Sequence, residues 1–295
     1  MGHWNPRRLT GFPKKMKNVI YCFYEKPVDW HDDYGQVTLP RMKEYAASID
    51  ADFKTITSDF FPPIVKKVDK IFKEKEYPHH QWLHFWNCTV SSMFLHYELL
   101  DSQYERMLVL AADVYVAKHA ENIFEDEELK TGVSMICLND SRYGKHMKHD
   151  INLFFNTQVD NCYYSPIVMS DRAGSLLVVD NFISDEEFLR AAESLNYVEE
   201  PRGEVSEVYT MENPNAPEIA TFMEEHLYSY LFHKGNIKVN SIDRSKWMRG
   251  ILDLSNPTGV NQVSNMYHFA GPNKKYLFDS KVLDTIDNGD INLKR

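Results

Sequence analysis

The chain has 295 residues, which is long enough to bury a substantial core as one large domain or as one domain with a subdomain. Its content of 43% hydrophobic and 13% aromatic residues indicates a globular protein and not a disordered one. The formal net charge of −10 argues against nucleic acid as the main partner, because a phosphate backbone needs a basic face. No apolar run approaches the roughly 18 residues of a membrane helix, so we expect no membrane span.

Four cysteines lie far apart in the sequence, at positions 22, 88, 137 and 162. Their spacing and mostly apolar surroundings predict buried thiols in a reducing compartment, not a disulfide framework or a zinc site. The basic residues 1–17 lack the apolar segment of a secretory signal. We therefore expect residues 1–17 to form an N-terminal arm, and the protein to be cytoplasmic or a trimmed luminal domain.

Strands and helices are predicted to alternate from residue 18 onward. The nearly all-apolar residues 18–24 predict a central strand, and the next helix is expected to be capped by Thr38 and opened by Pro40. A strand at 53–57 and a helix at 64–75 continue the pattern. Such alternation is typical of a parallel α/β sheet.

Later elements are predicted from apolar periodicity, capping residues and glycine. No internal repeat, low-complexity tract or linker divides the chain, so we predict one domain over residues 18–280 and a C-terminal tail over 281–295. The expected elements are helices at 91–102, 119–130, 184–195 and 215–234, strands at 107–110, 133–138, 163–169 and 237–240, and a capping box formed by Ser184 and Glu187.

Two groups of histidines are candidate metal ligands. The three histidines within residues 77–86 have no carboxylate nearby, and packing of a loop against the core is the favoured interpretation. His146 and His149 can ligate a metal from one helical face, but solvent-exposed loop histidines are commoner.

The most informative stretch is residues 104–116, Tyr-Glu-Arg-Met-Leu-Val-Leu-Ala-Ala-Asp-Val-Tyr-Val. Its apolar run at 107–110 predicts a strand that is covered on both faces. The run ends at Ala111 and Ala112 and then meets a single acid, Asp113. A carboxylate there is badly placed for packing and well placed for a ligand, because ligands bind beyond the carboxyl ends of strands in open α/β sheets.

Residues 266–275, Met-Tyr-His-Phe-Ala-Gly-Pro-Asn-Lys-Lys, form a second informative stretch. The imidazole of His268 suits a divalent transition metal, Gly271 permits close approach of backbone N–H groups to phosphate, and Lys274 can place a charge on a pyrophosphate leaving group. Alone, the decapeptide fits a surface turn equally well. Together with Asp113, which lies 155 residues before His268, it favours a ligand site. The chain has no P-loop, dinucleotide fingerprint or nucleophile elbow.

Both stretches resemble the signatures of nucleotide-sugar-dependent glycosyltransferases with the GT-A fold, particularly the family-8 type. In that family, a strand leads into a DxD motif that holds a divalent metal and the nucleotide diphosphate, and a C-terminal motif supplies a histidine, a glycine and a lysine. Asp113 and Val114 match the second half of the DxD motif. Ala111 replaces its first aspartate, so the motif is degenerate, and Met93 stands near the place of a lysine common in the preceding helix.

The resemblance implies an α/β GT-A fold, with a single mixed, mostly parallel sheet flanked by helices. It implies transfer of a sugar of the glucose, galactose or xylose class from a UDP-sugar to a carbohydrate acceptor. The alternative is a non-catalytic nucleotide-sugar or glycan-binding protein that kept the fold. Ala111 and Met93 favour this alternative, whereas the retained His268, Gly271 and Lys274 count against it.

The resemblance also implies which residues bind the nucleotide sugar. The first strand holds the base in the family, so Tyr21, Phe23 and Tyr24 are candidates to stack on uracil, although core packing is favoured for at least one of them. Ser165 falls where the family has an asparagine that contacts the donor sugar. The remaining implied binding residues are Asp113, Val114, His268, Gly271 and Lys274.

The resemblance implies that this chain retains two of the family's metal ligands, Asp113 and His268. We therefore expect weakly bound Mn²⁺ or Mg²⁺, or no metal requirement. Glu207 is the first candidate for a base that takes the acceptor proton, because it lies in an irregular segment before a long helix, and Asp160 is the second. An exposed structural carboxylate is the alternative for each. The sugar, the acceptor, the stereochemical outcome and the oligomeric state stay open.

Overall fold

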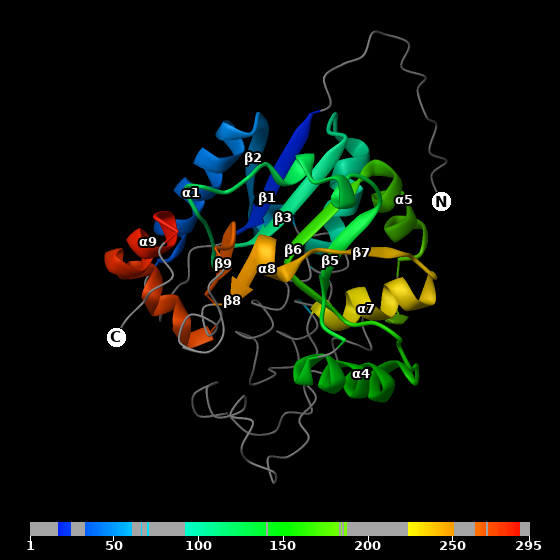
Figure 1. The fold of residues 1–295 in the computed structure, drawn as a ribbon. Coiled ribbons are helices and arrows are strands. Elements are labelled where there is room, and N and C mark those ends of the chain that lie inside the picture. Colours follow the sequence, from blue (N-terminus) through cyan, green and yellow to red (C-terminus); the bar gives the residue numbers. More distant parts are fainter. Residues whose placement is uncertain are drawn as a thin grey trace.

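The computed structural model of the protein describes residues 17–24, 33–60, 66, 70, 92–139, 141–182, 184, 186–187, 224–250, 263–269 and 271–289. Within these residues the chain forms a six-stranded sheet and a three-stranded sheet (Figure 1). Several predictions fall outside them and concern residues 1–16, most of the helix at 64–75, the histidines of residues 77–86, Cys88 and Glu207.

The larger sheet is mixed. In spatial order its strands are β2 (Ala51–Ile56), β1 (Asn18–Phe23), β3 (Arg106–Ala111), β6 (Tyr163–Asp171), β5 (Val133–Cys137) and β7 (Val239–Ser241). The strand β6 is antiparallel to both of its neighbours, and the other three of the five pairings are parallel. This confirms the predicted mixed, mostly parallel sheet.

The central strands β1 and β3 are buried on both faces. Val19 and Ile20 of β1, and Met107 and Leu108 of β3, are fully inaccessible to solvent. An apolar side chain on each face is what a strand needs when helices cover the sheet from both sides, because burying such side chains is the main favourable contribution to folding. The apolar runs at 18–24 and 107–110 therefore predicted these two strands correctly.

A smaller sheet continues the chain where β3 ends. Its order is β4 (Val114–Val116), β9 (Met266–His268), β8 (Met248–Gly250), with β9 antiparallel to β4 and parallel to β8. Only Ala112 and Asp113 separate β3 from β4, so Asp113 lies at the junction of the two sheets.

Helices cover both sheets. The helix α1 packs against β2 and β4, while α5 and α7 pack against β6, and α4 packs against α7. In Figure 1, α1 and α9 lie beside the small sheet, and α4 and α7 are stacked together. The helices are α1 (Gly35–Ser48), residues 92–101, α4 (Arg142–Phe155), α5 (Arg172–Asp180), α7 (Glu224–Lys234), α8 (Arg244–Trp247) and α9 (Ser280–Asp287).

The predicted start of α1 is wrong. The helix begins at Gly35, so Thr38 lies inside it, and Pro40 costs it one internal hydrogen bond because proline has no N–H. The Thr38 hydroxyl instead donates to the carbonyl oxygen of Ala112 at 2.7 Å. The threonine that resembled a cap therefore attaches α1 to the turn that carries Asp113.

The predicted helix at 119–130 is also wrong. Two short 3₁₀ turns, η2 (Ile123–Glu125) and η3 (Glu127–Leu129), occupy this segment. The Asn122 side chain accepts a hydrogen bond from the N–H of Phe124, and the Asp126 side chain accepts one from Glu128. Such local side-chain contacts compete with continuous helix and divide the segment into separate turns.

Four of the described helices, α4, α5, α8 and α9, were not predicted, and each begins at a side-chain cap. Ser141 accepts a hydrogen bond from the N–H of Gly144 at the start of α4, and Asp171 accepts one from Gly174 at the start of α5. These caps were readable in the sequence. The helices α4 and α5 were missed because the segment before residue 163 shows no strong apolar period, and the strand β6 leads directly into α5.

Other predicted features are confirmed. Ser184 and Glu187 exchange the two hydrogen bonds of a capping box, and α7 ends at Lys234, although Asn236 and not Gly235 has the positive φ of 47°. Cys22 and Cys162 are buried free thiols. In the described part of the chain, no helix is long and apolar enough to cross a membrane.

Candidate functional site

Three charged or polar side chains converge at the junction of the two sheets. The Nε2 atom of His268 lies 3.1 Å from Oδ1 of Asp113, and the Nζ atom of Lys274 lies 3.2 Å from Oδ2. All three side chains are largely buried, at 10% exposure for His268, 14% for Asp113 and 18% for Lys274. Both oxygens of the Asp113 carboxylate are therefore engaged.

Strand pairing brings the two distant parts of the sequence together. Val114 of β4 pairs with His268 of β9, and the N–H of Phe269 donates to the carbonyl oxygen of Asp113 at 3.0 Å. The 3₁₀ segment η6 (Gly271–Phe278) begins three residues after the end of β9 and carries Lys274. The pairing of β4 with β9 and the turn at η6 thus bring together the two informative stretches, residues 104–116 and 266–275.

The site keeps Asp113 ionised. Burial by itself would raise the pKa of Asp113, but the neighbouring His268 and Lys274 outweigh burial and hold this pKa well below its ordinary value. Removal of either neighbour would leave a buried carboxylate with less compensation, which is costly in a protein interior. The cluster is therefore held together by charge as well as by strand pairing.

Tyr164 fixes the imidazole of His268 from the other side. Its hydroxyl forms a hydrogen bond of 2.6 Å with Nδ1 of His268, and the two rings meet edge to face with centroids 5.5 Å apart. Both ring nitrogens of His268 thus have a partner, which sets the orientation of the ring. Sequence reasoning missed Tyr164, and its place directly before Ser165 was the available signal.

An aromatic pair borders the lysine side of the site. The Nζ atom of Lys274 lies 4.7 Å from the ring centroid of Tyr34, and Tyr24 meets Tyr34 edge to face at 5.9 Å. The Tyr24 hydroxyl donates to Asp33. A Cβ atom at Gly35 would overlap the Tyr24 ring, so glycine at this position allows the ring to lie against the start of α1.

The other two aromatic candidates on β1 lie elsewhere. Tyr21 is fully buried in the main core, with its ring below Lys54, whose Nζ atom is 5.8 Å from the ring centroid. Phe23 is half-buried and packs against the same core. The structure therefore brings Tyr24 to the Lys274 side of the site, whereas Tyr21 serves core packing.

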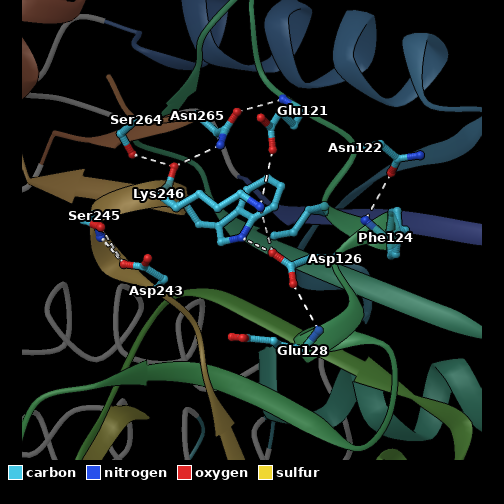
Figure 2. A network of polar contacts seen from close by, with 12 residues as sticks. Glu121, Asn122, Phe124, Asp126, Glu128, Asp243, Ser245, Lys246, Ser264 and Asn265 are labelled. Carbon is cyan, nitrogen blue, oxygen red and sulfur yellow. Dashed lines mark hydrogen bonds and ion pairs between the residues drawn. The ribbon is translucent and has the colours of Figure 1, made fainter. Parts of the chain in front are cut away.

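A polar network behind the small sheet holds β8 and β9 in place (Figure 2). The Nζ atom of Lys246 lies 3.1 Å from Asp126 and 3.4 Å from Glu121, while its backbone carbonyl accepts the side-chain amide of Asn265. The indole N–H of Trp247 donates to the same Asp126 carboxylate at 2.8 Å. These contacts connect α8, the start of β9 and the turns η2 and η3, so they stabilise the strand that carries His268.

Ser165 lies on β6 next to Tyr164 and contacts a carboxyl group that sequence reasoning missed. Its buried hydroxyl hydrogen-bonds Glu225, near the start of α7. Glu225 is only 6% exposed, and its Oε2 atom has no hydrogen-bond partner within the described residues. Burial raises the pKa of Glu225, although His226, Ser165 and His268 act in the opposite direction.

The remaining predicted residues do not join the cluster. Asp160 has a 90% exposed side chain, and its Oδ2 atom lies 3.8 Å from Nδ1 of His233. His233 lies eight residues after Glu225 on α7, or about 12 Å along the helix axis. Val114 is fully buried and contributes its backbone to the pairing with His268, and Gly271 is the first residue of η6.

The donor set does not by itself fit a divalent cation. Among the described residues, no group of three His, Cys, Asp or Glu side chains converges. Asp113 and His268 supply two candidate ligands, the position of a second carboxylate is Ala111, and the ammonium of Lys274 takes the second oxygen of Asp113. A hard cation needs more oxygen ligands than this pair provides.

The architecture matches solved structures. The galactosyltransferase LgtC, solved with donor and acceptor sugar analogues, aligns with a TM-score of 0.52 and 9% identity over 92% of this chain and 94% of that chain. The chain has the GT-A fold. A glycosyltransferase involved in the glycosylation of the major capsid of PBCV-1 aligns with a TM-score of 0.44 and 11% identity over 88% of this chain and 98% of that chain. No family model matches the sequence, and a search of curated proteins finds no relative.

The GT-A fold explains where the cluster lies. In open α/β sheets the ligand crevice lies beyond the carboxyl ends of parallel strands, and Asp113 follows the carboxyl end of β3. The antiparallel β6 presents its amino end there, because Leu110 pairs with Ile167. Tyr164 and Ser165 therefore lie at the same edge of the sheet as Asp113, on a strand of opposite direction.

Proposed function

We propose that this chain is a glycosyltransferase of the family-8 type with a degenerate DxD motif, which moves a sugar from a UDP-sugar to a carbohydrate acceptor. One observation carries the proposal: Asp113, His268 and Lys274 converge beyond the carboxyl end of β3, although 155 residues separate the first two. A buried lysine and imidazole beside a strand end suit the diphosphate of a nucleotide sugar.

Each part of the donor has a proposed partner. Lys274 and the backbone from Gly271 onward neutralise the diphosphate, which is the leaving group. Tyr24 borders the position of the base on one side, and Ser165 borders the sugar on the other. Asp113 orients Lys274 and His268, and it can accept hydrogen bonds from hydroxyl groups of the donor. The sugar is of the glucose, galactose or xylose class.

We propose that metal dependence is weak or absent. Lys274 already places a positive charge 3.2 Å from Oδ2 of Asp113, where a cation would lie. An ion recruited by the diphosphate would have Asp113 and His268 as its protein ligands and would be bound weakly, as Mn²⁺ or Mg²⁺. Electrostatic stabilisation of the leaving group then comes from the chain itself.

A base for the acceptor proton completes the proposal. Glu207 is the first proposed base, since acidic residues before the long helix lie on the acceptor side in the family that the sequence resembles, and Asp160 is the second. The 90% exposure of Asp160 permits contact with an incoming acceptor, but Asp160 lies outside the cluster of Asp113, His268 and Lys274, and this counts against it. Replacement of each by its amide, with turnover as the readout, tests these assignments.

Binding of UDP is the first test. A ligand that binds only the native state raises stability by mass action, so saturating UDP should raise the melting temperature, and more than ADP or GDP does. If ADP or GDP raises the melting temperature while UDP does not, the donor assignment is wrong. If UDP binds but no UDP-sugar is turned over with any acceptor, the chain is the non-catalytic nucleotide-sugar or glycan-binding alternative.

A further inference from the structure

The segment that carries Lys274 is attached to β4 at a second point, through Asp287. Asp287 is the last residue of α9, and its side chain is only 6% exposed. Its Oδ2 atom accepts a hydrogen bond of 3.0 Å from the Tyr115 hydroxyl, and its Oδ1 atom accepts one of 3.0 Å from the N–H of Lys118. The Nζ atom of Lys118 also lies 3.0 Å from Oδ2. Both oxygens of the Asp287 carboxylate are therefore paired with β4 and the residues that follow it.

An apolar cluster connects the two points of attachment. Side chains of η6 and α9 pack there against residues of β4, β9 and their flanks, in a cluster separate from the main core. Its buried members are Tyr115, Ala117, Tyr267, Phe269, Leu277, Val282 and Ile286. The segments η6 and α9 also contact each other. The chain between Lys274 and Asp287 thus rests on the small sheet, and a displacement of α9 would be transmitted to η6.

The two attachments lie at opposite ends of one short stretch of chain. Lys274 pairs with Asp113 directly before β4, and Asp287 pairs with Lys118, two residues after β4 ends. The ammonium of Lys274 ends a long flexible side chain, so its position depends on how firmly the backbone of η6 is held. Attachment at both ends of β4 restricts that backbone more than the pair with Asp113 alone.

We propose that Asp287 is a positioning residue for Lys274, which fixes α9 and η6 on β4 so that the ammonium lies where the diphosphate of the donor binds. Both oxygens of Asp287 are occupied by Tyr115 and Lys118, so it acts through Lys274 and not on the donor itself. Directional bonds to a buried carboxylate specify one register of α9 on β4 more strictly than apolar contacts do. The inference rests on the proposed function, in which Lys274 neutralises the diphosphate.

The test measures whether the effect of Asp287 depends on Lys274. Asp287→Ala removes the polar attachment, so UDP should bind roughly three- to tenfold less tightly in isothermal titration, while the affinity for uridine should change less than about twofold. In the Lys274→Ala background, Asp287→Ala should change UDP affinity less than about twofold, because the lysine through which it acts is absent. A merely structural role would not produce this dependence.

Milder variants keep the test valid if Asp287→Ala folds poorly. Tyr115→Phe keeps the ring in the apolar cluster and removes only the hydroxyl that donates to Asp287, so it should give a smaller loss with the same dependence on Lys274. Asp287→Asn keeps an acceptor oxygen and should recover part of the UDP affinity. Asp284 is exposed on the same helix, so Asp284→Ala is the matched control and should bind UDP as the wild type does.

Two outcomes would overturn the inference alone. UDP affinity within about twofold of the wild type for both Asp287→Ala and Tyr115→Phe would mean that Asp287 does not position the lysine. An equal fold loss with and without Lys274, or an equal loss for uridine, would show a structural role only. Failure of the wild type to bind UDP would refute the donor assignment of the proposed function, and the inference with it, so the two failures are distinguishable.

Discussion

Replacement of Lys274 by alanine should selectively weaken the binding of phosphate-bearing ligands. The ammonium lies 3.2 Å from Asp113 and 4.7 Å above the Tyr34 ring, with an exposure of 18% that limits screening by solvent. A hydrogen bond to a charged group in such surroundings contributes about 1.5–3 kcal/mol. Because about 1.4 kcal/mol corresponds to a factor of ten, UDP should bind about 10- to 150-fold less tightly to Lys274→Ala.

Isothermal titration with UDP and with uridine separates this effect from general damage. Uridine has no phosphate, so its affinity should be the same for wild type and variant. The neighbouring Lys275→Ala is the matched control, because the Lys275 side chain is exposed and lies 5.1 Å from the ring of Tyr276. Equal UDP affinity of wild type and Lys274→Ala, or an equal loss for uridine, would refute the reasoning.

Three further predictions follow from the same geometry. Turnover in excess EDTA should stay close to turnover with millimolar Mn²⁺; complete loss in EDTA that micromolar Mn²⁺ restores would show a tight metal site despite Ala111. Tyr164→Phe removes the hydrogen bond to Nδ1 of His268, so unfolding in urea should show a loss of about 0.5–1.5 kcal/mol, and UDP affinity should fall; unchanged values for both would mean that Tyr164 does not orient the imidazole. Gly35→Ala places a methyl group in the Tyr24 ring and should lower the free energy of unfolding by about 1–3 kcal/mol, whereas an unchanged stability would mean that the ring moves away freely.

The sequence predicted one half of the site because that half depends on local patterns. Asp113 ends an apolar strand and His268 begins a glycine- and lysine-containing segment, and each pattern has a chemical meaning without knowledge of the fold. Pairing of β4 with β9 then brings the two together. The central strands were predictable for the same reason, since residues that are apolar on both faces leave few alternatives.

The other half depends on tertiary structure. Tyr164 and Asp287 look like ordinary residues of a strand and a helix, and their importance lies in contacts with His268 in one case and with Tyr115 and Lys118 in the other. Such contacts arise only when β6 and α9 meet the small sheet. Thr38 shows the opposite error, because a residue typical of a helix cap is used inside α1 to hold the carbonyl of Ala112.

The most direct test of the account is release of UDP from UDP-glucose, UDP-galactose and UDP-xylose, measured with a panel of carbohydrate acceptors. The account predicts that at least one donor is consumed, that a glycosylated acceptor appears in equal amount by mass spectrometry, and that Lys274→Ala reduces the rate while Lys275→Ala does not. Failure of the wild type to release UDP from any donor under conditions where UDP itself binds would contradict the assignment of this chain as a glycosyltransferase.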